Sequence, residues 1–281
     1  MKIQTCGKVI KYSLLAITIF GAILLEGFSP TSSNSNIQQA SADQNSEQTQ
    51  TNANRAANIV LVHGAWADGS SWSKVIPILE KAGHRVIAVQ LPLHSLADDV
   101  ATVKRTVELV GEPTILVGHS YGGFVITNAA YNNPNVTGLV YVAAFAPDED
   151  ESPADFIDVT KLPEGFLVLD SGGFVYINQT QFPQAFAQDV KPAEARIMAV
   201  VQKPIHQSIL GEESGPPAWK QLPTWYEVSE NDRIIPPDTE RQFAEQMDAT
   251  TISLDSSHAS LVSQPDEIAD LILDAAKETT K

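Results

Sequence analysis

Short apolar segments alternate with segments of helical periodicity along most of the chain. The apolar segments are rich in β-branched residues, as are strands that are buried on both faces of a parallel sheet. They cover residues 58–63, 85–89, 113–118, 136–145, 224–229 and 250–255. Between them, apolar residues recur every three or four positions, which is typical of amphipathic helices. The alternation predicts an α/β fold with a mostly parallel sheet and helices on both faces.

Two of the expected helices carry distinct local signals. The first presents one apolar face, formed by Trp72, Val75, Ile76 and Leu79. Because Pro77 falls within this pattern, we expect a kink there. Ser95 is of a residue type that caps helix N-termini, so the second helix should begin directly after it.

The segment 147–222 interrupts the alternation of strands and helices. It carries many aromatic residues among prolines and acids. An insertion of this kind between two strands predicts a helical cap over one edge of the sheet, above a ligand pocket. The alternative is a second packed subdomain that has no role in ligand binding.

The N-terminus has the pattern of an export signal. Three lysines precede residues 12–25, an uncharged apolar run. This run is shorter than the roughly 20 residues of a membrane-spanning helix and is typical of a signal peptide. The segment Ala40-Ser41-Ala42, which resembles an A-x-A cleavage signal, follows it, so we expect a signal peptide over residues 1–42. The alternative is an N-terminal anchor that is not cleaved.

The export signal implies the remaining domain boundaries. Residues 43–57 are polar and without periodicity, which predicts a flexible linker, and the folded domain should then cover 58–281. With or without cleavage, this domain would lie outside the cytoplasm, either periplasmic or secreted. A membrane partner is expected only through an uncleaved N-terminal segment.

The net charge and the cysteine content limit which partners and which covalent cross-links the protein can have. Lys and Arg number 18 against 34 Asp and Glu, which gives a net charge of −16. This charge argues against a nucleic-acid partner, which requires a positive surface. The single cysteine, Cys6, lies in the expected signal peptide, so the folded domain would contain no disulfide.

The segment 118–122, Gly-His-Ser-Tyr-Gly, follows one of the apolar strands. It fits the G-x-S-x-G pattern in which a strained strand-to-helix turn exposes a nucleophilic serine. Small residues are needed at both ends because side chains there would meet the neighbouring strand and helix. Ser120 is therefore the candidate nucleophile.

A serine nucleophile requires a base and an acid that orients the base. In this architecture the three residues follow one another in the order serine, acid, histidine. Of the six histidines, only His258 follows the last expected strand, so we predict that it is the base. Asp232, just past the preceding strand, is the predicted acid. Its rivals are Glu230, Asp238 and Asp255.

The loop after the first strand, HGAWADGSSW, is the candidate oxyanion hole. The glycine after His63 allows the backbone to turn and to present amide groups. We expect the Ala65 N–H, with Trp66 as the less favoured alternative, to act together with the Tyr121 N–H.

Five stretches carry a resemblance to a known family: VLVHGAW, LPLHSLADD, GHSYGG, SENDRIIPP and SHASLVSQPDEI. Residues 58–276 resemble the α/β-hydrolase superfamily, and within it small bacterial serine esterases and the plant methylesterase and hydroxynitrile-lyase group. The resemblance implies an α/β-hydrolase fold and a Ser120–His258–Asp232 triad. It also implies an oxyanion hole at Ala65 and Tyr121, with no metal and no organic cofactor.

These features predict a carboxylesterase that cleaves small to medium, uncharged ester molecules through an acyl-enzyme on Ser120. Trp66 and the aromatic residues of the cap suggest an apolar substrate pocket. The alternatives are a lyase and a ligand-binding receptor. Lyases of the related plant group carry a threonine in place of Gly64, and a lysine in place of Ala259 that stabilises cyanide. The absence of this lysine argues against lyase chemistry here.

Overall fold

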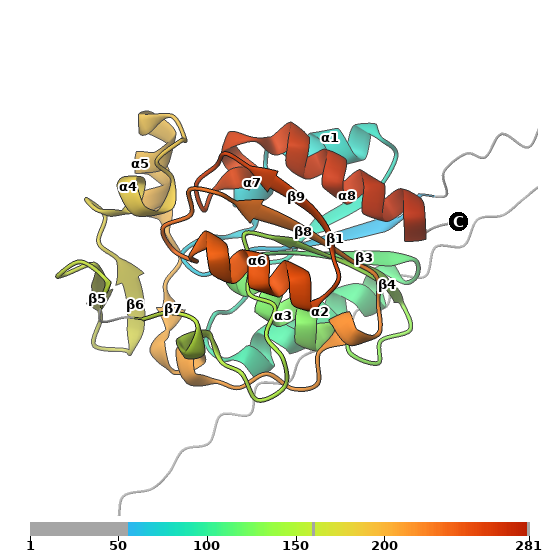
Figure 1. The fold of residues 1–281 in the computed structure, drawn as a ribbon, viewed down its shortest axis with the longest axis horizontal. Coiled ribbons are helices and arrows are strands. Elements are labelled where there is room, and N and C mark those ends of the chain that lie inside the picture. Colours follow the sequence, from blue (N-terminus) through green and yellow to red (C-terminus); the bar gives the residue numbers. More distant parts are fainter. Residues whose placement is uncertain (1–55, 159–160, 280–281) are drawn as a thin grey trace, which may run out of the picture. The chain divides into compact units, whose positions relative to one another are not determined.

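The computed structural model describes residues 56–158 and 161–279 (Figure 1). The predicted signal peptide, residues 1–42, lies outside the described residues, as does nearly all of the predicted linker. Ala57, at the end of that linker, is 1% exposed, and its carbonyl accepts a hydrogen bond from the Arg85 N–H at 3.2 Å. Ala57 is therefore part of the fold. None of the helices in the described ranges is both long and apolar enough to cross a membrane.

Six strands form one sheet in the order β2-β1-β3-β4-β8-β9, and neighbouring strands are parallel throughout. The strands are β1 (Asn58–Val62), β2 (Arg85–Ala88), β3 (Thr114–His119), β4 (Val136–Val142), β8 (Thr224–Ser229) and β9 (Thr250–Leu254). They match the six predicted strands. Every residue of the central strand β3 is buried, which explains its continuous apolar run. Parallel pairing brings the carboxyl ends of the strands to one edge, where the loops can form a site.

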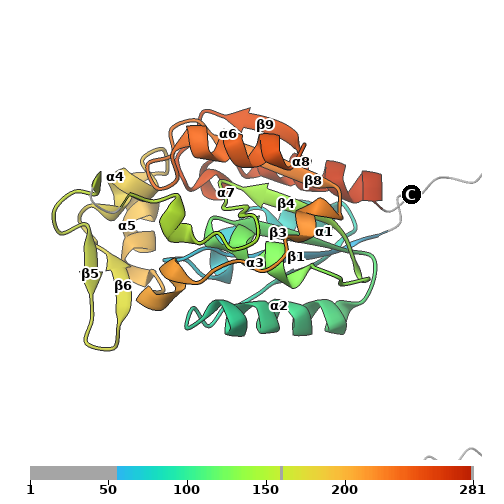
Figure 2. The same cartoon turned by 60° about the horizontal axis from the view of Figure 1, so that its bottom comes forward.

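Helices cover both faces of the sheet (Figure 2). They are α1 (Ile76–Lys81), α2 (Leu96–Val110), α3 (Tyr121–Ala129), α6 (Pro237–Gln246), α7 (Ser260–Ser263) and α8 (Pro265–Thr279). The helices α2 and α3 pack together on one face, and α1 and α8 contact each other on the other face. The α/β fold expected from the sequence is therefore present.

The ends of the first two helices test two local predictions. Ser95 is the N-cap of α2, and its hydroxyl accepts a hydrogen bond from the Asp98 N–H at 3.1 Å, which confirms the cap. The prediction of a kink at Pro77 is wrong. A separate 3₁₀ turn (Gly69–Trp72) precedes α1, and Pro77 lies in the first turn of α1. At that position the missing proline N–H removes no helical hydrogen bond.

The cap is helical only in part. It contains α4 (Phe182–Phe186), α5 (Pro192–Val201) and 3₁₀ turns at Pro153–Asp155, Gln207–Gly211 and Ala218–Lys220. It also contains an antiparallel sheet in the order β5-β6-β7, formed by β5 (Leu167–Leu169), β6 (Phe174–Ile177) and β7 (Ile205–His206). This sheet was not predicted from the sequence. A turn at Gly173, with a φ of +84°, joins β5 to β6. The cap lies at one end of the main sheet (Figure 1).

Candidate active site

Ser120 lies in a sharp turn between β3 and α3. Its φ is 55° and its ψ is −124°, a strained conformation for a residue with a side chain. A Cβ added at Gly118 would lie 2.6 Å from the carbonyl carbon of Gly122. A Cβ at Gly122 would in turn collide with the backbone of Val62. The close approach of these backbones therefore requires both glycines around Ser120.

The structure brings Ser120, His258 and Asp232 together. The Ser120 hydroxyl lies 2.8 Å from Nε2 of His258, and Nδ1 of His258 lies 2.5 Å from Oδ2 of Asp232. With Nδ1–H donating to the carboxylate, Nε2 is free to accept the hydroxyl proton. The three residues are 2%, 0% and 6% exposed, respectively. This arrangement can activate a serine hydroxyl, and the catalytic roles predicted for the three residues remain predictions.

Backbone groups hold the Asp232 carboxylate in place. Its Oδ1 accepts hydrogen bonds from the N–H groups of Ile234 and Ile235 at 2.6 and 2.9 Å. Oδ2 is then left for His258. The chain folds this way because Asp232 closes the turn between β8 and the proline-led start of α6.

The three rival acids lie elsewhere. Glu230 and Asp238 both pair with Arg241, at 2.7 and 3.0 Å. Asp255 is exposed and accepts a hydrogen bond from the side chain of Asn231. Among the four candidate acids, Asp232 is the one whose carboxylate contacts His258.

The loop after β1 lies directly against the nucleophile. A Cβ added at Gly64 would lie 2.6 Å from Cβ of Ser120. The Gly64 carbonyl is 2.8 Å from Nδ1 of His63, while Nε2 of His63 accepts the Leu91 N–H at 3.0 Å. The ring is therefore neutral, with its proton on Nδ1, and burial lowers the pKa of His63 to about 4. In a trans peptide the Ala65 N–H points away from the Gly64 carbonyl, so His63 fixes its direction.

Tyr121, the second residue of the predicted oxyanion hole, begins α3 directly after Ser120. The N–H group at the first position of a helix has no partner within the helix and is available to an anion. The Tyr121 hydroxyl donates to Oδ2 of Asp99 at 2.8 Å, and the Leu93 N–H donates to Oδ1 at 2.8 Å. Burial raises the pKa of Asp99 to about 6. Asp99 therefore supports the elbow from α2, a role that the sequence analysis did not predict.

His119, the second residue of the pentapeptide, supports the base. Its Nε2–H donates to the carbonyl oxygen of His258 at 2.7 Å, and the two rings lie 4.8 Å apart. Burial lowers the pKa of His119 well below its usual value, so the ring is neutral. Within the described ranges, no three His, Cys, Asp or Glu side chains form a possible metal-binding group.

Two buried glutamates near the triad were also not predicted from the sequence. Glu227 on β8 and Glu240 on α6 are both 0% exposed. Hydroxyl groups of Ser229 and Ser260 donate to Glu227, each at 2.9 Å. The one signal in the sequence is a glutamate inside the otherwise uncharged strand 224–229.

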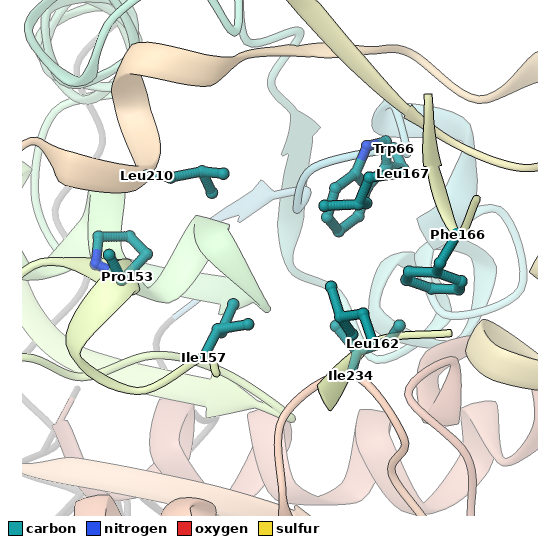
Figure 3. A pocket seen from close by; sticks show the side chains of 9 residues that line it. Trp66, Pro153, Ile157, Leu162, Phe166, Leu167, Leu210 and Ile234 are labelled. Atoms are coloured by element: carbon teal, nitrogen blue, oxygen red, sulfur yellow. The ribbon is translucent and has the colours of Figure 1, made fainter. Parts of the chain in front are cut away.

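An apolar pocket lies between the cap and the loops that follow β1 and β8 (Figure 3). It encloses about 480 Å³ of unfilled space, part of it open to solvent. It is lined by Trp66, Pro153, Ala154, Ile157, Leu162, Phe166, Leu167, Leu210 and Ile234. Trp66 follows the predicted oxyanion residue Ala65, and Ile234 lies two residues after Asp232. The pocket is therefore adjacent to both loops of the site.

Contacts between the cap and this region include one to Trp66 and one to His258. The indole N–H of Trp66 donates to the Val175 carbonyl on β6 at 2.9 Å. Phe186 on α4 packs edge-on against His258, with ring centroids 4.7 Å apart. The cap therefore covers the base and fixes the tryptophan that the sequence analysis assigned to the pocket.

Comparison with known proteins gives relatives with similar folds. Methylesterase 2 of Arabidopsis thaliana is 26% identical over 78% of this chain and 95% of its own length. Pyrethroid hydrolase of Sphingobium wenxiniae is 26% identical over 78% of this chain and 87% of its own length. The crystal structure of a pyrethroid hydrolase from Sphingobium faniae JZ-2 superposes with a TM-score of 0.67 at 24% identity. It matches 79% of this chain and 97% of that one.

The match to a family extends over most of the folded domain. The sequence model of the alpha/beta hydrolase family matches residues 59–271, which span β1 to α8 and include all three residues of the Ser120–His258–Asp232 arrangement. The strained serine turn and the parallel sheet agree with this match. The chain belongs to the α/β hydrolase family.

Proposed function

We propose that this protein is a serine carboxylesterase that hydrolyses small to medium, uncharged ester molecules. The observation that carries the proposal is the chain of hydrogen bonds from Ser120 through His258 to Asp232, next to an apolar pocket. The names of two relatives, a methylesterase and a pyrethroid hydrolase, support ester cleavage.

The geometry suits acyl transfer in two steps. The Ser120 oxygen attacks the ester carbonyl carbon while Nε2 of His258 takes the hydroxyl proton. Asp232 stabilises the resulting imidazolium, and the N–H groups of Ala65 and Tyr121 stabilise the oxyanion. Collapse of the intermediate expels the alcohol, which receives its proton from His258. Water then attacks the acyl-enzyme with His258 as base, and the acid is released.

The lining of the pocket supports this substrate class. Its lining consists of apolar side chains, so an uncharged, apolar acyl or alcohol group is favoured and a charged group would lose its hydration without a partner. Two carboxylates of the cap are held by contacts with residues outside the cap. Glu194 pairs with Lys74 at 2.9 Å, and Asp189 accepts hydrogen bonds from the Ser257 N–H and the Ser263 hydroxyl.

The lyase alternative fits the site less well. A threonine in place of Gly64 would bring its Cβ into collision with Ser120 unless the loop moved. Ala259, which follows His258, is 0% exposed and supplies no cation that could hold a departing cyanide. Both positions favour hydrolysis.

The test is hydrolysis of p-nitrophenyl esters from acetate to palmitate, together with labelling by a fluorophosphonate. We expect labelling at Ser120, its loss in Ser120→Ala, and the highest kcat/KM for short or medium acyl chains. A maximum at palmitate with activation by an oil–water interface would indicate a lipase. Cyanohydrin cleavage without ester hydrolysis would indicate a lyase.

We also propose that the domain is exported, because of the basic and apolar pattern at the N-terminus. N-terminal sequencing of the protein from a bacterial host should find a chain that starts near Asp43 or an intact chain in the membrane fraction. An intact Met1 on a protein in the soluble cytoplasmic fraction would contradict export.

A further inference from the structure

A buried carboxyl group that the proposed reaction does not use lies beside Asp232. Glu240 on α6 is 0% exposed, and its Oε2 accepts a hydrogen bond from the Ser229 N–H at 2.8 Å. Its other oxygen, Oε1, is buried and has no donor among the described residues. A side-chain hydrogen bond with Asp232 is among the causes that raise the pKa of Glu240, so the two carboxyl groups are neighbours. A hydrogen bond between two carboxyl groups requires a proton on one of them.

The groups around Glu240 favour its neutral form. Burial is the largest cause that raises the pKa of Glu240, followed by the negative charges of Asp232 and Glu227. The Ser229 N–H is the group that lowers it. The Tyr226 phenol, which also faces this cluster, has its own pKa raised well above normal, mainly by burial, and is therefore neutral.

The nearest cation on the same helix is engaged elsewhere. Arg241 follows Glu240 directly, but its guanidinium pairs with Glu230 at 2.7 Å and with Asp238 at 3.0 Å. These pairs lie at the surface, with the Arg241 side chain 41% exposed. Arg241 therefore leaves the buried oxygen of Glu240 without a counter-charge.

Within the cluster, the proton belongs on Glu240 rather than on its partners. Burial raises the pKa of Glu227 to about 7, and hydroxyl hydrogen bonds from Ser229, Ser256 and Ser260 oppose that rise by stabilising the anion. Asp232 accepts two backbone N–H bonds besides that of His258. Glu240 accepts one hydrogen bond, from the Ser229 N–H, and its Oε1 has no donor among the described residues.

We propose that Glu240 is a positioning residue that stays protonated and donates a hydrogen bond from Oε1 to the Asp232 carboxylate. The proposal rests on Asp232 acting as the triad acid of the proposed esterase. The hydrogen bond holds that carboxylate against His258. Because Glu240 is protonated, it does not place a second negative charge beside the triad. Such a charge would stabilise protonated His258, which cannot accept the Ser120 proton, and activity would then begin only at higher pH.

Three variants separate the donor role from charge and from packing. In Glu240→Gln, the amide N–H can donate to Asp232 while the amide oxygen accepts from Ser229. We expect kcat/KM within about threefold of wild type and an unchanged acidic limb of the pH–rate profile. Glu240→Leu removes the donor and should lower kcat/KM about 10- to 100-fold, as expected for a lost hydrogen bond to a charged group. Glu245→Gln, at an exposed position of the same helix, is the matched control and should behave as wild type.

Two outcomes would overturn the proposal. If Glu240 is ionised in the wild type, Glu240→Gln removes a negative charge, and the acidic limb moves to lower pH. Wild-type kcat/KM in a folded Glu240→Leu variant would show that no donor is needed.

An infrared difference spectrum tests the protonation without relying on activity. Wild type minus Glu240→Gln at neutral pH should show the carbonyl band of a protonated carboxylic acid, which wild type minus Glu245→Gln should lack. Absence of this band would refute the proposal even if Glu240→Leu fails to fold. A band in a protein without any esterase activity would support the protonated Glu240 while refuting the proposed function.

Discussion

Replacing Gly64 by alanine should lower kcat while the protein remains folded. The added Cβ would lie 2.6 Å from Cβ of Ser120, 3.0 Å from the His119 carbonyl oxygen and 3.2 Å from Oγ of Ser120. Because carbon atoms normally approach to about 3.5–4.0 Å, the loop or the serine must move by about 1 Å. Either movement changes the distance between the nucleophile and the Ala65 N–H.

The size of the effect follows from that displacement. A misplacement of about 1 Å costs about 10²-fold in rate, and loss of one oxyanion donor costs about 10²- to 10³-fold in kcat. We therefore expect kcat to fall by about 10²-fold. KM should change less than kcat, because Trp66 is the one residue of this loop that lines the apolar pocket.

The assay is steady-state hydrolysis of p-nitrophenyl butyrate, with urea unfolding measured on the same preparations. Gly211→Ala is the matched control, because an added Cβ there would meet nothing within 4 Å and the residue does not require a positive φ. Both variants should remain folded. A kcat for Gly64→Ala within threefold of Gly211→Ala would refute the idea that this contact positions the oxyanion loop.

Three further outcomes test the site. Asp232→Asn should lower kcat by several orders of magnitude, while Glu230→Gln leaves it unchanged; the reverse result would make Glu230 the acid. Phe186→Ala opens a cavity over His258 and should lower the free energy of unfolding by about 3–5 kcal/mol, measured in urea. Burial raises the pKa of Glu227 to about 7 from 4.5, so the folded state holds a proton that the unfolded state loses, and stability falls as pH rises between these values. Glu227→Gln should remove this loss, about 3 kcal/mol, and an unchanged pH dependence of unfolding would contradict it.

The main sheet could be predicted because each strand is a short apolar run between turn signals. The kink at Pro77 failed for a definable reason. The 3₁₀ turn at Gly69–Trp72 and the helix that starts at Ile76 together present the same apolar spacing as one longer helix. Pro77 then looks internal, although it lies in a first turn. The antiparallel sheet of the cap was missed because β5 and β6 have three and four residues, too few to show a period.

The candidate triad could be predicted because its chemistry constrains residue type, chain order and position after strands. Its supports could not. The helix dipole is enough to explain an acid such as Glu240 in the first turn of a helix. The sequence therefore gives no sign that this acid is buried. Asp99 has the same ambiguity in α2, where it is 0% exposed and binds the Tyr121 hydroxyl. Burial of these acids depends on which neighbour the helix packs against, and a single sequence does not contain that information.

The buried acids connect the two loops that carry the candidate acid and base. Glu227 lies on β8, the strand that leads into the Asp232 loop, and it accepts hydroxyl bonds from Ser256 and Ser260, which stand on either side of His258. One carboxyl group thus ties the loop after β9 to the end of β8. Burial of a carboxyl group costs desolvation energy. The hydrogen bonds of Glu227 hold the two loops in position. A shift of either loop would break these bonds before it changed the distance between His258 and Asp232.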